Sequence, residues 1–172
     1  SACIVLRYAA VRRQFGKEKN REMSIIEYPH FQSRMFPHYA NHLITLFTAR
    51  AINNLWNTNY SSILDPKNKQ VKEMHALMSA LKPISTWYAV RAVREAREAM
   101  GGNGMSLLSG IPSSLNDSNV IVTWEGDNNV LLQQTAKFLL SGVAKVFKGE
   151  ESNYPSLKFL TMQPEQDYFP NG

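Results

Sequence analysis

The chain has 172 residues, 44% of them hydrophobic and 19% charged, and this length favours a single domain with one buried core. Its 19 Lys and Arg residues against 14 Asp and Glu give a net charge of +5, but the basic side chains are scattered, which argues against nucleic-acid binding. No apolar run approaches the ~20 residues of a membrane-spanning helix, and the single cysteine, Cys3, excludes an intrachain disulfide.

The first third of the chain contains two segments with helical periodicity. The chain opens with SACIVLRYAAVRRQF, which starts in apolar residues without a helix cap, so we expect residue 1 to lie inside a longer protein. The second segment runs from Ser24 to about Tyr60 and repeats apolar residues three and four positions apart. Pro29 and Pro37 are expected near its start or at a kink.

A third helical segment follows a loop at residues 61–70. It runs from about Lys67 to Met100, and the glycine pair 101–102 suits a helix end that needs a left-handed residue. The next stretch, 103–126, is polar and rich in turn-forming residues, so we expect no long helix there.

A fourth helix is predicted from about Asp127 to Phe147, with Asp127 as its cap. The tail, 148–172, alternates proline with polar residues and is typical of a linker or the start of a following segment. Four amphipathic segments joined by short loops predict an all-α fold, an antiparallel four-helix bundle over residues 1–147.

The motif RRQFG, at residues 12–16, breaks the helical pattern. Arg12 and Arg13 offer planar guanidinium groups suited to a diphosphate, and Phe15 could pack on a heterocycle. A basic helix end that complements the helix dipole is the simpler interpretation of the motif alone.

The motif GGNG, at residues 101–104, would let a phosphate or another backbone approach closely, because glycine has no Cβ. A plain helix stop explains the same glycines. A Rossmann interpretation fails, since the motif lacks the G-x-G-x-x-G spacing and follows no strand.

The motif TWEGDNN, at residues 123–129, contains a candidate base. Glu125 follows an apolar run and precedes Gly126 and a helix start, so partial desolvation would raise the pKa of Glu125 toward a useful value. A solvent-exposed Glu125 beside a capping Asp127 is the alternative, and the motif alone leaves both open. His38 and His42 could share a metal, but no Glu follows His38 as H-E-x-x-H requires, so we predict no metal site.

RYAAVRRQFG, AMGGNG and TWEGDNNVLLQQTAKFLL together closely resemble the acyl-CoA dehydrogenase and oxidase superfamily, in order and in spacing. Within it they resemble the acyl-CoA oxidases, and the resemblance covers Arg7 to about Gly142. It implies a C-terminal four-helix bundle that packs against an N-terminal helical domain and a β-domain outside this chain. It also implies a homodimer.

The resemblance also implies a reaction. Glu125 would remove the α-proton of a fatty acyl-CoA thioester while the β-hydride passes to N5 of FAD, which gives the trans-2-enoyl-CoA. Arg12 would contact the FAD diphosphate, usually that of the neighbouring subunit. The residues implied to contact FAD are Arg12, Gln14, Phe15, Gly101, Gly102, Asp127 and Asn129.

Two features resemble the oxidases rather than the dehydrogenases. Asp127 follows the EG dipeptide, where dehydrogenases usually have threonine. The segment IIEYPHFQSRMFP resembles the oxidase helix. Its EYP tripeptide is similar to that of oxidases that act on branched substrates such as pristanoyl-CoA. An oxidase would reduce O₂ to hydrogen peroxide in fatty acid β-oxidation. The resemblance implies a peroxisomal location, although the chain shows no targeting signal.

Five positions depart from the family pattern, namely Pro29, Glu98, Asn103, Met105 and Trp124. Two other functions therefore stay open. One is an acyl-CoA dehydrogenase that passes electrons to an electron-transfer flavoprotein, and the other is a catalytically silent helical interaction module.

Overall fold

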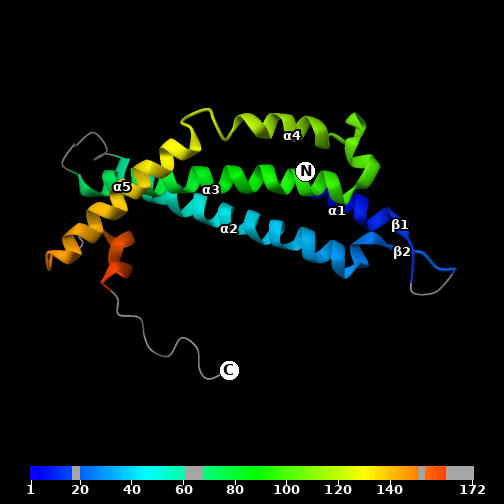
Figure 1. The fold of residues 1–172 in the computed structure, drawn as a ribbon, viewed down its shortest axis with the longest axis horizontal. Coiled ribbons are helices and arrows are strands. Elements are labelled where there is room, and N and C mark those ends of the chain that lie inside the picture. Colours follow the sequence, from blue (N-terminus) through cyan, green and yellow to red (C-terminus); the bar gives the residue numbers. More distant parts are fainter. Residues whose placement is uncertain (17–19, 61–67, 151–153, 162–172) are drawn as a thin grey trace, which may run out of the picture.

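The structure is a computed structural model and describes residues 1–16, 20–60, 68–150 and 154–161. Its α-helices are α1 (Ala2–Val11), α2 (Pro29–Asn59), α3 (Lys69–Ala99), α4 (Ile111–Val120) and α5 (Asn128–Phe147), as labelled in Figure 1. Short 3-10 helices are η1 (Ile25–Glu27), η3 (Gly101–Met105), η4 (Leu107–Ser109) and η5 (Pro155–Leu160). Two-residue strands, β1 (Arg13–Gln14) and β2 (Met23–Ser24), pair antiparallel.

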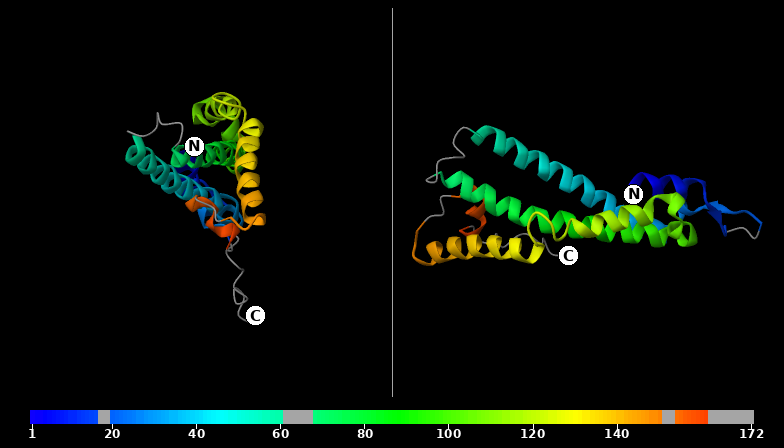
Figure 2. Two further views of the ribbon diagram at one scale, coloured as in Figure 1. Left: turned by 90° about the vertical axis from the view of Figure 1, so that its left-hand side faces the viewer. Right: turned by 90° about the horizontal axis from the view of Figure 1, so that it is seen from above.

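Helix α3 is the centre of the bundle and packs against α1, α2, α4 and α5. Figure 2 shows α2 and α5 on either side of the first half of α3, whereas α4 and α1 lie along its second half. The main core gathers at that second half, where Val93 and Ala96 of α3 meet Val5 of α1, Met35 of α2 and Ile111. The predicted all-α helical bundle is confirmed.

The predicted helix ends of α3 and α5 are confirmed by their local chemistry. Asn68 caps α3 by accepting a hydrogen bond from the Gln70 amide at 2.9 Å, and Gly101 follows the helix with a left-handed φ of 57°. Asp127 caps α5, as expected. The loop expected at residues 61–70 lies mostly outside the described residues.

The β1–β2 pair and helix α4 were not predicted from the sequence. The β1–β2 pair places Arg13 opposite Ser24, directly after α1, where we expected the helix to continue. Helix α4 forms within the turn-rich stretch, because Gly110 ends η4 with a φ of 70° and the fully buried Ile111 anchors the next helix in the core.

The start of the tail packs against α5. Leu157 of η5 is 1% exposed, and a Cβ built on Gly142 of α5 would lie 2.5 Å from the Leu157 side chain. The Phe138 and Tyr154 rings meet edge to face at 5.0 Å. The domain boundary after residue 147 stays a prediction. In the described part of the chain, no helix is both long and apolar enough to cross a membrane.

Candidate active site and cofactor surface

The turn before α5 holds Glu125 in an unusual backbone conformation. Its φ is 54°, and among the described residues it is the only non-glycine residue with a positive φ. Gly126 follows with a φ of 104°. A left-handed conformation at a residue with a Cβ persists only where surrounding contacts enforce it, and such residues cluster at functional sites.

The turn is closed by backbone hydrogen bonds on both sides of Glu125. The Thr123 and Trp124 amides both donate to the Val120 carbonyl at 3.1 Å, and the Asn128 amide donates to the Val122 carbonyl at 3.1 Å. The end of α4 and the start of α5 are thereby tied together around the glutamate.

Asp127 is engaged in capping α5. Its Oδ1 accepts hydrogen bonds from the Asn129 amide at 2.9 Å and the Val130 amide at 3.3 Å. This satisfies two of the free amides at the helix start. Asn129 itself is exposed, and the contacts of Asp127 and Asn129 with a flavin stay predictions.

A polar network that was not predicted from the sequence joins this turn to α3. Lys82 of α3 donates from Nζ to the Gly126 carbonyl at 2.6 Å and to Asn128 Oδ1 at 2.8 Å. Asn128, which is 1% exposed, donates from Nδ2 to Thr86 Oγ1 at 2.9 Å. Lys82 and Thr86 are four residues apart on one helix face, a spacing that could have indicated a shared partner.

The carboxylate of Glu125 is exposed in this chain, and so is Trp124, at 54%. The desolvation that we expected from the apolar run before Glu125 is therefore not supplied by the described residues. The preceding residues 120–122 are themselves partly exposed, since the turn lies at the surface of the bundle.

A second group of predicted site residues lies at the far end of α3. Gln14 and Gly101 line one pocket of about 210 Å³, together with Tyr28. Arg12 is exposed, and Phe15 is 85% exposed. The segment is nevertheless fixed, because its Arg12 carbonyl accepts from the Ile25 amide at 2.9 Å and its Phe15 carbonyl accepts from the Tyr28 hydroxyl.

The glycines of GGNG divide into two kinds. A Cβ built on Gly101 or Gly102 would meet nothing within 4 Å, whereas one on Gly104 would lie 2.1 Å from the Arg97 carbonyl oxygen. Gly104 is thus required for packing within the chain. Gly101 and Gly102 leave open space, which fits the predicted approach of a phosphate.

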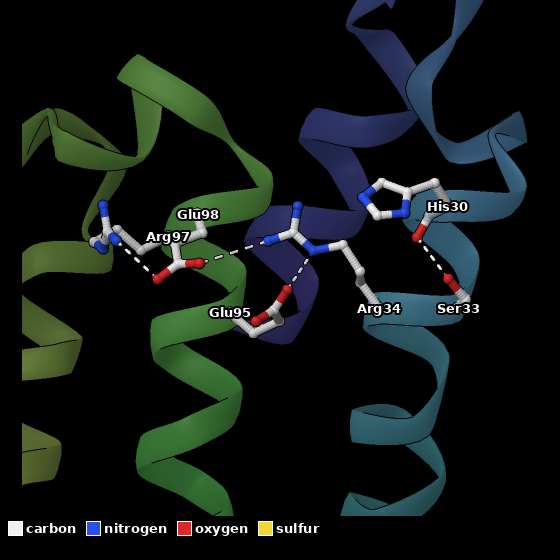
Figure 3. A network of polar contacts seen from close by, with 6 residues as sticks. All are labelled: His30, Ser33, Arg34, Glu95, Arg97 and Glu98. Atoms are coloured by element: carbon white, nitrogen blue, oxygen red, sulfur yellow. Dashed lines mark hydrogen bonds and ion pairs between the residues drawn. The ribbon is translucent and has the colours of Figure 1, made fainter.

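Charged side chains beside this pocket form an ion-pair network between α2 and α3 (Figure 3). Arg34 of α2 pairs with Glu95, and its Nη2 lies 3.7 Å from Glu98 Oε2. Arg97 Nη2 lies 3.1 Å from Glu98 Oε1. Glu98, which departs from the family pattern, therefore has ion-pair partners within the chain.

Two further departures also have partners within the chain. Asn103 donates from Nδ2 to the Tyr8 hydroxyl at 2.9 Å, and Met105 Sδ accepts from Arg97 Nη1 at 3.2 Å. Pro29 is the first residue of α2, a position that suits proline because no helical carbonyl needs its missing amide hydrogen.

The structure separates the predicted site residues into two regions. Glu125, Asp127 and Asn129 lie near Lys82, and Gln14 and Gly101 lie near the end of α3 at Ala99. Ala99 lies 17 positions after Lys82 on α3, which corresponds to about 25 Å of helix. We call the first region the base turn (residues 123–129) and the second the glycine end (residues 12–16 and 101–104).

Comparison with known proteins defines the class. Residues 1–140 match the family described as the acyl-CoA oxidase C-alpha1 domain, and the chain belongs to this family. The resemblance inferred from three motifs is thereby confirmed.

Individual relatives agree with this assignment. The chain is 33% identical to acyl-coenzyme A oxidase acox-3 of Caenorhabditis elegans, over 96% of this chain and 26% of the relative. It is 33% identical to human peroxisomal acyl-coenzyme A oxidase 3, over 95% of this chain and 25% of the relative. The crystal structure of C. elegans acyl-CoA oxidase-1 complexed with FAD and ATP superposes with a TM-score of 0.90 at 31% identity. The match covers 95% of this chain and 26% of that structure's chain. The chain thus spans about a quarter of the length of these relatives.

Proposed function

We propose that the complete protein is an FAD-dependent acyl-CoA oxidase. It would convert a fatty acyl-CoA to the trans-2-enoyl-CoA and reduce O₂ to hydrogen peroxide, as a step of β-oxidation. The observation that carries this proposal is the enforced left-handed Glu125 at the start of α5, in a chain that belongs to the acyl-CoA oxidase family.

Glu125 is proposed as the base that takes the α-proton of the thioester substrate. Its turn projects from the bundle surface, and a carboxylate oxygen there can accept a proton from a substrate bound against the turn. The apolar surroundings that favour proton transfer would come from substrate and protein outside the described residues.

The glycine end is proposed to hold FAD. The exposed Arg12 guanidinium suits a diphosphate, the exposed Phe15 ring and Gln14 suit the adenosine portion, and Gly101 leaves room for a phosphate. Bound FAD supplies the acceptor for the β-hydride and the site at which O₂ is reduced. A relative crystallised with FAD supports this assignment.

A homodimer is proposed because the two regions lie about 25 Å apart and because α2 carries uncovered apolar side chains. Leu43, Ile44 and Phe47 are 53%, 62% and 64% exposed, and a row of this kind typically marks an interface. We further propose a peroxisomal location and a branched acyl-CoA substrate. The human peroxisomal relative supports the location, and the Glu27-Tyr28-Pro29 tripeptide supports the substrate.

The test replaces Glu125 by Gln in the complete protein and follows peroxide released with a long-chain or a branched acyl-CoA. Turnover should fall about 10²- to 10⁴-fold, because the amide cannot accept the proton. The exposed Glu150→Gln is the matched control and should leave turnover unchanged. Unchanged turnover in Glu125→Gln would remove the base assignment.

Spectroscopy separates the other two functions from the oxidase. A purified protein without flavin absorption would favour the silent interaction module. A flavin that is reduced by substrate without air and recovers slowly when air is admitted would favour the dehydrogenase. Rapid recovery with peroxide release supports the oxidase.

A further inference from the structure

The base turn is held in place by one cation from another helix. Lys82 Nζ lies 2.6 Å from the carbonyl oxygen of Gly126, the residue directly after Glu125. Gly126 and Glu125 both have positive φ values, and the conformation of Glu125 persists only where surrounding contacts enforce it.

The same ammonium group also fixes the first residue of α5. Its second acceptor is Asn128 Oδ1 at 2.8 Å. The side-chain nitrogen of Asn128, Nδ2, donates in turn to Thr86 Oγ1. Thr86 donates its hydroxyl to the Lys82 carbonyl at 2.8 Å, which closes the network on α3. Both the oxygen and the nitrogen of the Asn128 side-chain amide are thus hydrogen-bonded to residues of α3.

The bonding of Lys82 is unusual for a lysine. Within the described part of the chain, no carboxylate lies within 4.0 Å of its ammonium group, which instead donates to a backbone carbonyl oxygen and to a side-chain amide oxygen. Hydrogen bonds from a charged donor are stronger than those between neutral groups. The contact with Asn128 is also partly buried, which strengthens it further.

We propose that Lys82 is a positioning residue that holds Glu125 in the geometry needed for proton abstraction. This role rests on the proposed function of Glu125 as the base. Lys82 acts through the Gly126 carbonyl and Asn128, and thereby fixes the path of the backbone that carries the carboxylate. Displacing a catalytic group by about 1 Å can cost on the order of 100-fold in rate, so loss of this contact should reduce turnover strongly.

The test uses Lys82→Met and Lys82→Arg in the complete protein. Methionine keeps most of the length and removes the donors, whereas arginine keeps both charge and donors. The control is Lys137→Met, at an exposed lysine on α5 outside both regions. Thr86→Val is a second, milder variant, which leaves both Lys82 contacts with the turn in place and removes the partner of Asn128 Nδ2 together with the hydroxyl's bond to the Lys82 carbonyl.

Hydrogen exchange of the complete protein is the first readout, because it does not depend on activity. Lys82→Met should speed exchange in peptides covering residues 120–128 about tenfold, since the hydrogen-bonded amides of Thr123, Trp124 and Asn128 lose their support. Lys82→Arg and Thr86→Val should give smaller increases, and Lys137→Met none. Unchanged exchange in the turn, or an equal increase throughout α3 and α5, would overturn the proposal.

Steady-state kinetics is the second readout. Lys82→Met should lower kcat about 10- to 100-fold with KM changed less than about threefold, and Lys82→Arg should recover much of kcat. Faster exchange in the turn together with wild-type kcat would contradict the positioning role. If the wild-type protein oxidises no acyl-CoA, the proposed function fails, while hydrogen exchange still decides whether Lys82 holds the turn.

Discussion

The base turn and the glycine end differ in how their backbone is held and in what they leave open. The base turn is tied to α3 by a network that includes Asn128, which is 1% exposed. The glycine end leaves Arg12 and Phe15 exposed and open space beside Gly101 and Gly102. The first region is therefore organised within one chain, and the second is the surface that we propose a ligand completes.

This difference in backbone support and exposure fits the role proposed for each region. A base must be held within a fraction of an ångström, so the turn proposed to carry one benefits from hydrogen bonds inside the protein. A cofactor surface must let a large molecule approach, so exposed cations and glycines are useful there. Substitutions at the two ends should accordingly change different properties.

Gly104→Ala is expected to have the largest effect on stability. Its Cβ would lie 2.1 Å from the Arg97 carbonyl oxygen, a backbone atom that cannot move without shifting the end of α3. The free energy of unfolding should fall by about 3 kcal/mol, measured by denaturant titration of the complete protein. A change below about 0.5 kcal/mol would contradict the packing at this end.

Arg12→Met is expected to weaken FAD binding without unfolding the protein. Loss of a charged hydrogen-bond donor at a diphosphate should raise the FAD dissociation constant about 10- to 100-fold, measured by flavin titration of the apoprotein. Arg7→Met, at an exposed arginine within α1, is the matched control. Equal affinities in the two variants would remove Arg12 from the proposed cofactor surface.

Asp127→Ala is expected to destabilise the start of α5. The Asn129 and Val130 amides would lose their acceptor, which should lower the free energy of unfolding by about 1 kcal/mol. Asp127→Asn should keep the cap and most of the stability. Equal thermal unfolding of the alanine and asparagine variants would argue against the capping role.

Gly102→Ala is expected to have the smallest effect on stability. Its φ is not left-handed and its Cβ would meet nothing within 4 Å, so the free energy of unfolding should change by less than about 0.5 kcal/mol. FAD binding should nevertheless weaken, because the methyl group occupies the space proposed for a phosphate. Wild-type affinity for FAD would place the diphosphate elsewhere.

Features that depend on a few neighbouring residues were predictable from the sequence. The end of α3 at the glycine pair and the start of α5 at Asp127 follow from local capping rules. The order of three motifs was enough to indicate the family.

Features that depend on tertiary contacts were not predictable. The Lys82–Asn128 contact joins residues 46 positions apart, and the β1–β2 pair depends on a return of the chain after α1. The exposure of Glu125 is a similar case, because desolvation depends on what packs over the turn, not on the apolar residues before it. Helix α4 forms because Ile111 is buried in the core, which no local pattern indicated.

The central claim is that Glu125 removes the substrate proton, and the rate of anaerobic flavin reduction by an acyl-CoA tests it most directly. The measurement compares the complete wild-type protein with Glu125→Gln at equal flavin content, so it isolates the chemical step from O₂ and from cofactor binding. We predict a rate at least about 100-fold lower in the variant. Equal rates in the two proteins would contradict the account.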